Sequence, residues 1–307
     1  MRPRRSGEAL RDLLLLSGTH RLYLTSGGFG MISCGSIEKD VIRRHYDVST
    51  FFYRLLWGRH IHHGLWDGNE SPQQAAQQLT ERLAREAGIL AGSRVLDIGC
   101  GMGGSSIYLA RELGCRVTGV TLSPFQRRWA SLAARFGGTG GRADFLCADA
   151  ERVEFAAGDA DVVWSVECTE HLFDKPAFFR RAAEWLKPGG RMAICVWFAG
   201  DGPLTPVQEQ LAYGVCEGFF CPSFGSESEY REWMTTAGLT VTASYDWTSR
   251  VSRTWEICRD RVNRWGIHRV AHWIDPGQII FLDRFQMLLD AYNTGAMKYG
   301  CLIAEKR

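Results

Sequence analysis

The chain has 307 residues, of which 45% are apolar, and its formal net charge is +2 with both signs mixed along the sequence. This length suffices for one large hydrophobic core, and the balanced charge gives no reason to expect a nucleic-acid partner. The ten cysteines form no CxxC pair, so we predict buried thiols in a reducing, cytoplasmic compartment. The apolar run at residues 13–16 is too short for a signal peptide or a membrane span, so we expect no stable membrane insertion.

The first 40 residues are predicted to form an N-terminal helical arm. Residues 8–24 are rich in leucine, and the glycine-rich stretch SGGFGMISCGS follows them. An apolar helix behind such a hinge can cover the protein's own pocket or that of a neighbouring subunit. We therefore expect a lid or an exchanged element in a homo-oligomer. A disordered tail and a helix packed behind the sheet are the alternatives.

Residues 41–307 are predicted to form one α/β domain. Residues 41–90 have a helical pattern, and from Arg94 onward short apolar runs alternate with helical segments. The predicted strands lie at residues 94–99, 115–122, 143–148, 159–168, 191–198, 239–247 and 297–305. This alternation indicates a doubly wound, mostly parallel seven-stranded sheet. Residues 200–237 fit no strand of this pattern and are predicted to form a cap insertion over the substrate.

The segment VLDIGCGMGGSS places four glycines directly after a predicted strand. Glycines in such a turn let the backbone approach a ligand at the start of the next helix. Gly99, Gly101 and Gly104 match the G-x-G-x-x-G pattern of nicotinamide- and flavin-dependent enzymes. That pattern needs an acidic residue about 20 positions later, and residues 113–142 contain none. Asp97, just before the turn, would repel a pyrophosphate and suits a positively charged ligand.

These residues resemble a known family. VLDIGCGMGGSS resembles the first motif of class I S-adenosylmethionine-dependent methyltransferases. TLSPFQ, WSVECTEH and the lead-in HYDVST followed by WGRHIHHG resemble the gamma-tocopherol methyltransferase group, which is related to small-molecule carbon and nitrogen methyltransferases and to cyclopropane fatty-acid synthases. The resemblance extends over residues 41–307. It implies a Rossmann-like fold and S-adenosyl-L-methionine as the cofactor.

The resemblance also implies which residues hold the cofactor. The glycine turn would receive the methionine part, the end of the second strand would flank the ribose, and the residues after the third strand would meet the adenine. Residues of the helical lead-in would close over the methionine end, with ordinary helix packing as the alternative for Tyr46 and His63. The expected cofactor residues are Tyr46, His63, Gly64, Asp97, Gly99, Gly101, Gly103, Thr121, Leu122, Gln126, Asp149, Ala150 and Glu151.

Three catalytic candidates follow the fourth predicted strand: Glu167, Glu170 and His171. This position corresponds to the carboxyl edge of a parallel sheet, where ligands bind. Methyl transfer mainly needs positioning in a dry pocket, after which a proton must leave the methylated atom. Each of the three side chains could accept that proton. The alternative is that Glu170 and His171 only cap the following turn and support the cofactor loop.

The acceptor is predicted to be a lipophilic small molecule, because aromatic residues are concentrated after the fifth predicted strand. Trp197, Tyr213, Phe219 and Phe220 are the expected substrate residues. The chain has eleven tryptophans, which favour a pocket for a flat or hydrocarbon-rich molecule, although core packing accounts for many of them.

We predict methylation of a carbon atom on a prenylated secondary metabolite, with coupled cyclisation as one variant. The alternatives are nitrogen of an indole-type alkaloid and an aromatic-ring carbon of a tocopherol-like phenol. A binding protein without transfer chemistry is a further alternative, which the acidic residues after the fourth strand disfavour.

Two groups of histidines raise the question of a metal site. His60, His62 and His63 share one loop, and His268 and His272 are four residues apart. A metal site usually also needs a convergent carboxylate or thiolate, and neither group has one beside it in the sequence. We therefore expect no metal ion.

Overall fold

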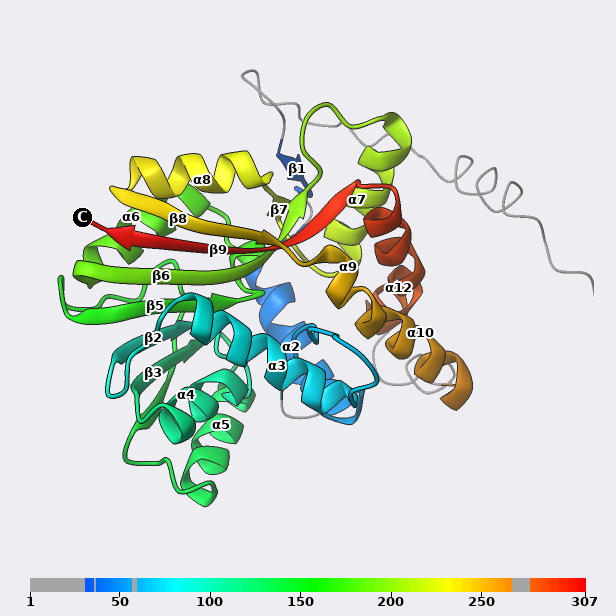
Figure 1. Cartoon of the computed structure of the whole chain (residues 1–307). Coiled ribbons are helices and arrows are strands. Elements are labelled where there is room, and N and C mark those ends of the chain that lie inside the picture. Colours follow the sequence, from blue (N-terminus) through cyan, green and yellow to red (C-terminus); the bar gives the residue numbers. More distant parts are fainter. Residues whose placement is uncertain (1–30, 36, 57–59, 267–276) are drawn as a thin grey trace, which may run out of the picture.

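The computed structural model describes residues 31–35, 37–56, 60–266 and 277–307. Its centre is a seven-stranded sheet with the strand order β4-β3-β2-β5-β6-β9-β8 (Figure 1). The strands are β2 (Arg94–Ile98), β3 (Arg116–Thr121), β4 (Ala143–Cys147), β5 (Ala160–Val166), β6 (Leu186–Ala199), β8 (Leu239–Asp246) and β9 (Met297–Lys306). β9 runs antiparallel to β6 and β8, and the others are parallel to their neighbours. The predicted doubly wound α/β fold is confirmed.

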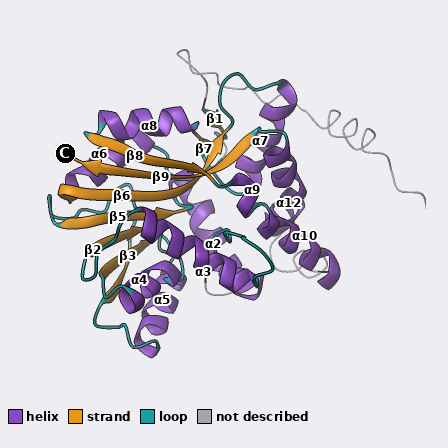
Figure 2. Ribbon diagram, in the orientation of Figure 1, coloured by secondary structure: helices purple, strands orange, loops and turns teal. Residues whose placement is uncertain are grey.

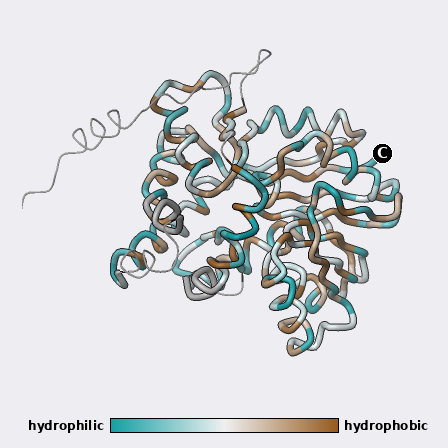
Figure 3. Tube along the Cα trace, turned by 180° about the vertical axis from the view of Figure 1, so that it is seen from behind, coloured by the Kyte–Doolittle hydropathy of each residue, from teal (hydrophilic) through white to brown (hydrophobic). Residues whose placement is uncertain are grey.

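Helices cover both faces of this sheet (Figure 2). One face carries α3 (Pro72–Glu86), α4 (Gly104–Glu112) and α5 (Pro124–Phe136), and the other carries α6 (Lys175–Trp185) and α8 (Glu227–Thr236). The hydrophobic residues are concentrated along the strands between these layers (Figure 3). A central strand such as β5, with Val163 and Trp164 fully buried, has no polar alternation because helices or loops cover both of its faces.

Four further helices form a cap beside the sheet. They are α7 (Pro206–Gly218), α9 (Thr248–Val251), α10 (Arg253–Trp265) and α12 (Gly277–Asn293), and both α7 and α10 pack against α12. The predicted cap insertion at residues 200–237 therefore contributes α7, whereas its last helix, α8, packs beside α6 and β8. A second group of cap helices, α9, α10 and α12, follows β8 in the sequence. The sequence pattern did not show that these helices belong to the cap, because helical periodicity does not indicate where a helix packs.

The N-terminal part of the described chain is tied to this cap. β1 (Ile32–Ser33) pairs antiparallel with β7 (Ser223–Phe224), and the Cys34 amide donates to the Pro222 carbonyl oxygen at 2.8 Å. The long helix α2 (Lys39–Leu56) follows, so the boundary predicted at residue 40 falls within its first turn. Residues 8–24 lie outside the described residues, and their role as lid or exchanged element stays a prediction. No described helix is both long and apolar enough to cross a membrane.

Candidate functional site

Ten of the thirteen expected cofactor residues line one cavity at the carboxyl ends of β2, β3, β4 and β5. We call it the glycine-turn cavity, and with its open mouth it encloses about 990 Å³. The ten residues are Tyr46, Asp97, Gly99, Gly101, Thr121, Leu122, Gln126, Asp149, Ala150 and Glu151. Glu167 and His171 line the same cavity. The fold thus brings together residues that are far apart in the sequence, such as Tyr46 and His171, which are separated by 125 positions.

The turn after β2 needs glycine for two physical reasons. Gly99 has φ of 82°, which L-residues rarely adopt, and a side chain there would collide with Cys168. Gly101 also has a positive φ, 54°, and forms part of the cavity wall. Gly103 does not line the cavity. It begins α4, where a side chain would meet Ala130 and Phe145, so its role is close helix-to-sheet packing.

Asp97 is a buried carboxyl on the wall of this cavity, just before the glycine turn. Its carboxyl is 2% exposed and accepts a hydrogen bond from the Ser106 hydroxyl at 2.5 Å. Burial raises the pKa of Asp97 to about 7, although the hydrogen bonds from Ser106 oppose the rise. Among the described residues no cation pairs with it. A ligand ammonium would supply that missing partner and favour the ionised carboxylate, so the donor set fits the amino-acid end of S-adenosyl-L-methionine.

A polar cluster at the end of β3 holds α2 over the cavity. The Thr121 hydroxyl donates to Gln126 Oε1 at 2.9 Å, and the Gln126 amide nitrogen donates to the Thr50 hydroxyl at 3.2 Å. The Ser123 hydroxyl donates to Asp47, also on α2. The residues at the end of β3 are therefore uncharged, where a dinucleotide-binding enzyme carries its ribose-binding acid, and the carboxylate beside them comes from Asp47 on α2.

Sequence reasoning missed Lys39, which lies in the first turn of α2 and lines the cavity. Its ammonium contacts Asp149 Oδ2 at 2.5 Å and Glu151 Oε2 at 2.6 Å. Burial lowers the pKa of Lys39, but its bonds to the two carboxylates outweigh this effect and leave the pKa raised. Glu151 Oε1 also accepts from the Phe173 and Asp174 amides, at 2.9 and 2.7 Å. The carboxylates of Asp149 and Glu151 therefore already have hydrogen-bond or ion-pair partners within the protein.

Two thiols face the same cavity. Cys100 belongs to the glycine turn and Cys168 follows β5. Burial, reinforced by the charges of Glu170 and Asp97, raises the pKa of Cys168 to about 12. Burial likewise raises the pKa of Cys100 well above the usual thiol value.

A second, smaller cavity adjoins the first, and we call it the aromatic cavity. Its aromatic walls come from Trp197 on β6, Phe219 at the end of α7 and Trp255 on α10. The Trp197 ring packs edge-on against Phe219 and Trp255, with centroid distances of 5.1 and 5.9 Å. Two of the expected substrate residues, Trp197 and Phe219, therefore lie on this cavity.

The other two expected substrate residues lie elsewhere. Tyr213 is on α7, where the Cys34 thiol donates to its hydroxyl at 3.8 Å near the β1 segment. The Phe220 ring packs against His45 on α2 with a centroid distance of 4.6 Å. Neither side chain lines the aromatic cavity. The physical reason is that the chain turns sharply after α7, and Phe220 adopts a positive φ of 55° that directs it away from Phe219.

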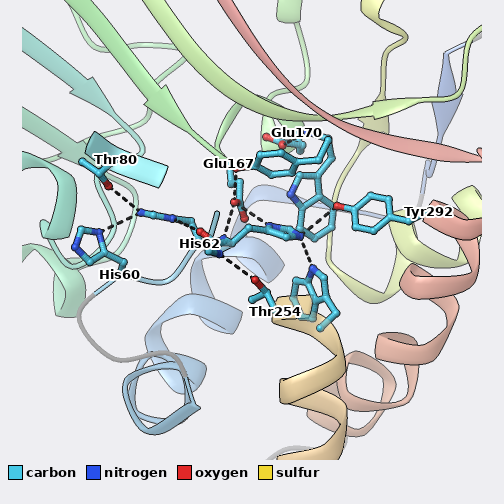
Figure 4. Close-up of polar contacts among 12 residues, drawn as sticks. His60, His62, Thr80, Glu167, Glu170, Thr254 and Tyr292 are labelled. Atoms are coloured by element: carbon cyan, nitrogen blue, oxygen red, sulfur yellow. Dashed lines mark hydrogen bonds and ion pairs between the residues drawn. The ribbon is translucent and has the colours of Figure 1, made fainter. Parts of the chain in front are cut away.

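Glu167 lies on the wall of both cavities and is held rigidly (Figure 4). Its Oε1 accepts hydrogen bonds from the His63 amide at 2.8 Å, from His63 Nδ1 at 2.9 Å and from the Tyr299 hydroxyl at 2.8 Å. Burial alone would raise the pKa of Glu167, but the electrostatic effect of His63 and the hydrogen bonds that His63 donates outweigh burial and lower it. Glu167 is therefore a fixed, ionised carboxylate.

His63 and Gly64 do not line the glycine-turn cavity, contrary to the expectation that they close over the cofactor. His63 lies behind Glu167; its Nε2 accepts from Trp255 Nε1 and lies 3.2 Å from the Tyr292 hydroxyl. The Gly64 amide donates to the Thr254 hydroxyl at 2.9 Å. Both residues thus connect the lead-in loop to the cap and orient Glu167.

Glu170 differs from Glu167 in its charge state. It is 2% exposed, and its Oε1 accepts a hydrogen bond from the Trp197 amide at 2.6 Å. Burial raises the pKa of Glu170 to about 8, although the Trp197 amide opposes the rise. Among the described residues, Oε2 has no hydrogen-bond partner. Glu170 is therefore protonated at neutral pH and cannot accept a proton there.

His171 and Tyr46 form a hydrogen-bonded pair between the cavities. His171 Nδ1 lies 3.1 Å from the Phe220 carbonyl oxygen, which only accepts, so Nδ1 carries the ring proton. His171 Nε2 therefore accepts from the Tyr46 hydroxyl at 2.7 Å. Burial lowers the pKa of His171 to about 4, which keeps the ring neutral.

The loop histidines form a hydrogen-bonded chain. His62 Nδ1 donates to the His63 carbonyl oxygen at 2.8 Å, and its Nε2 accepts from His60 Nδ1 at 3.1 Å, as Figure 4 shows. In the part of the chain that the structure describes, no three His, Cys, Asp or Glu side chains are grouped so that they could hold a metal ion. His268 and His272 lie outside the described residues.

Known sequences resemble this chain over most of its length. A family model described as a methyltransferase domain matches residues 70–244. The chloroplastic tocopherol O-methyltransferase of Arabidopsis thaliana is 29% identical over 285 residues, which cover 86% of this chain and 81% of the relative. The 2-methyl-6-phytyl-1,4-hydroquinone methyltransferase of Synechocystis sp. is 29% identical over 317 residues, which cover 96% and 97% of the two chains.

A solved structure shares the fold. The cyclopropane synthase MmaA2 from Mycobacterium tuberculosis superposes with a TM-score of 0.78 at 19% identity, covering 89% of this chain and all of that one. The family model spans more than half of the chain. The chain therefore belongs to the methyltransferase domain family, and it is an S-adenosyl-L-methionine-dependent methyltransferase.

Proposed function

We propose that the protein transfers the methyl group of S-adenosyl-L-methionine to a carbon atom of a lipophilic, prenylated small molecule. The observation that carries this proposal is the position of Glu167. Its ionised carboxylate lies on the wall shared by the two cavities, with aromatic walls beyond it. The two relatives are named for tocopherol and for a phytyl hydroquinone, both lipophilic prenyl compounds, which supports the same class of acceptor.

The cofactor would occupy the glycine-turn cavity. When bound, it supplies an electrophilic methyl group on a sulfonium. Asp97 and the glycine turn would bind its amino-acid end, and the Thr121–Gln126 cluster would contact the ribose through uncharged groups. α2 covers the cavity and helps to exclude water from the reacting atoms.

Methylation of an alkene or an electron-rich ring leaves positive charge on the acceptor carbon. Glu167 stabilises that charge as a fixed anion, and the faces of Trp197 and Trp255 add cation–π attraction. Because three donors hold Glu167 Oε1 in place, little reorganisation is needed during the reaction. Coupled cyclisation belongs to the same proposal, since such a cation can be attacked by a second double bond.

The proton that the acceptor loses passes to the Tyr46–His171 pair. Tyr46 Oη accepts it while its own proton moves to His171 Nε2 across the 2.7 Å hydrogen bond. A histidine with a pKa of about 4 is a weak base, which suffices for a carbocation because that is a strong acid. The same histidine would not deprotonate an alkylammonium efficiently. This argument favours carbon over nitrogen of an indole-type alkaloid, the second candidate.

The test is product analysis with the full-length enzyme. It is incubated with S-adenosyl-L-methionine and with prenylated indoles, tocopherol-like phenols or prenyl diphosphates, and the products are examined by mass spectrometry and NMR. We expect one new carbon–methyl bond, with S-adenosyl-L-homocysteine released in equal amount. Methylation of nitrogen or oxygen would contradict the proposal, and so would the absence of S-adenosyl-L-homocysteine. The cytoplasmic location and the homo-oligomer also remain predictions, and the solution mass tests the latter.

A further inference from the structure

Helix α5 exposes an unusual row of large apolar side chains. Among the described residues ten large hydrophobic side chains are exposed, and five of them lie on α5 and the adjacent edge strand β4. Phe125, Trp129, Leu132 and Phe136 are 45%, 41%, 55% and 85% exposed, and Leu146 on β4 is also exposed. Scattered exposed hydrophobic residues are normal, but a contiguous patch indicates an interaction site.

The spacing of these residues places them on one side of the helix. Phe125, Trp129, Leu132 and Phe136 follow one another at intervals of four, three and four residues, so they form one stripe along α5. The sheet-facing side of the helix is a different one, made by Ala130 and Ala134, which are fully buried. The α5 stripe is therefore not needed for the hydrophobic core.

Arginines flank the α5 stripe without acidic neighbours on the helix. Arg127, Arg128 and Arg135 lie on α5, and Asp144 on β4 is the one acidic residue among residues 113–147. Arg128 and Arg135 are exposed and form no ion pair with any described residue. The net charge of +2 for the whole chain conceals this local excess of positive charge. Aromatic and leucine side chains beside unpaired arginines are typical of helices that lie at the surface of an anionic bilayer.

We propose that α5 and the edge of β4 form a docking surface for anionic phospholipid membranes. The protein would associate peripherally, with the α5 stripe at the level of the headgroups and acyl chains and the arginines near lipid phosphates. Leu122 and Gln126, at the start of α5, line the glycine-turn cavity. Docking would therefore bring the active site close to the lipid phase, from which a lipophilic acceptor would enter.

Two other possible occupants of this surface, a second copy of the chain and the N-terminal arm, are less complementary to its positive charge. In a two-fold symmetric dimer the same patch meets itself, so the arginines of the two copies would face each other. Residues 8–24 of the N-terminal arm contain two acidic and two arginine residues, which offers no excess of negative charge. A bilayer rich in anionic lipid is complementary to both the apolar and the basic parts of the surface.

The test measures co-sedimentation of the full chain with vesicles and needs no acceptor molecule. We expect binding to phosphatidylcholine vesicles that contain phosphatidylglycerol, and weaker binding to phosphatidylcholine alone. The double variant Leu132→Ser/Phe136→Ser should bind at least about tenfold more weakly, because it removes two side chains from the lipid contact. The double variant Arg128→Gln/Arg135→Gln should lose the preference for anionic vesicles.

The controls separate lipid binding from folding and from the other occupants. Leu90→Ser, at a position 75% exposed in the loop before β2, should bind vesicles like the parent. Calorimetry should give an unchanged affinity for S-adenosyl-L-methionine in all variants. Equal binding to both vesicle types, or parental binding by Leu132→Ser/Phe136→Ser, overturns the proposal. A lower solution mass of that variant would assign the surface to a second copy, and vesicle binding that occurs only after deletion of residues 1–30 would assign it to the arm; both results also overturn the proposal.

Discussion

The glycine-turn cavity and the aromatic cavity share five wall residues, yet the protein builds them in different ways. The shared residues are Tyr46, Ile61, His62, Glu167 and His171. The glycine-turn cavity is formed mainly by residues that directly follow strands of the sheet. The aromatic cavity takes its remaining walls from β6, the end of α7, α10, and Glu170 after β5. Under the proposed function, the sheet edge would bind the cofactor, whereas the cap would contact the acceptor.

Because the two cavities are built differently, we expect substitutions in the glycine-turn cavity to change cofactor affinity and substitutions at Glu167 to change turnover. Gly101→Val should reduce the affinity for S-adenosyl-L-methionine at least about 100-fold in calorimetry, because valine is strained at φ 54° and its side chain would approach Ile61. The sheet should remain folded by circular dichroism. NADH should bind to neither parent nor variant.

The matched control is Gly158→Val. Gly158 has a similar φ of 68°, but a side chain there would meet no atom within 4 Å, and the residue does not line the cavity. It should therefore retain parental affinity for the cofactor. Equal losses of affinity in both variants would show that backbone strain alone, rather than the cavity wall, causes the effect.

Glu167→Gln should lower turnover and leave the affinity for S-adenosyl-L-methionine nearly unchanged. The variant keeps the oxygen that accepts from His63 and Tyr299 but removes the negative charge, so turnover should fall roughly 10²- to 10³-fold. Affinity for S-adenosyl-L-methionine in calorimetry should stay within about threefold of the parent. A turnover above about one third of the parental value would leave Glu167 with a structural role only.

Glu170→Gln should change stability more than chemistry. Since the folded pKa of about 8 lies above the usual value of 4.5, the carboxyl contributes its full stability below pH 4.5, and this contribution declines steadily as the pH rises from 4.5 to 8. Glutamine is neutral at every pH. The variant should therefore match the parent at pH 4.5 and exceed it by up to about 3 kcal/mol near pH 7.

Urea unfolding at both pH values tests this prediction. The control is Glu232→Gln, on the exposed side of α8, which reports the effect of the substitution itself. A lower stability of Glu170→Gln than of the parent at pH 7 would mean that the carboxyl is ionised in the folded protein. In that case Glu170 would again be a candidate for the group that accepts the proton.

Lys39→Met should give the smallest effect. It leaves Asp149 and Glu151 without their shared cation, at the end of the cavity assigned to the uncharged adenine. Because Lys39 is about one-third exposed, solvent screens part of this loss, and cofactor affinity should fall only about three- to tenfold in calorimetry. Lys39→Arg keeps the charge and should retain most of the affinity. A loss above about 100-fold would mean that Lys39 contacts the cofactor itself.

The sheet and most of the glycine-turn cavity could be predicted because their signals are local. Each strand is a continuous apolar run, and the residues directly after β2, β3, β4 and β5 must meet at one edge of a parallel sheet. Asp97 was singled out by its place just before the glycine turn, Asp149 was implied by the family resemblance, and both line the cavity. Lys39 was not predicted, because its position depends on how α2 crosses that edge rather than on any pattern around it.

The aromatic cavity could be predicted only in part. An aromatic residue is equally suited to a core and to a substrate pocket, and tertiary packing decides between them. Of the four residues selected from the sequence, Trp197 and Phe219 line this cavity, whereas Tyr213 and Phe220 do not, and no pattern singled out Trp255. Likewise, no sequence signal distinguishes Glu167 from Glu170. Their different charge states arise from the donors that folding brings to one and not to the other.

The thiols of Cys100 and Cys168 have a consequence for the durability of the enzyme. A thiolate beside a methyl sulfonium would be alkylated, which would inactivate the protein after a limited number of turnovers. Burial and the neighbouring carboxylates keep the pKa of Cys168 near 12 and that of Cys100 well above the usual value. At neutral pH both remain weakly nucleophilic thiols. The same burial and negative charge that serve the cofactor cavity thus protect its wall from self-methylation.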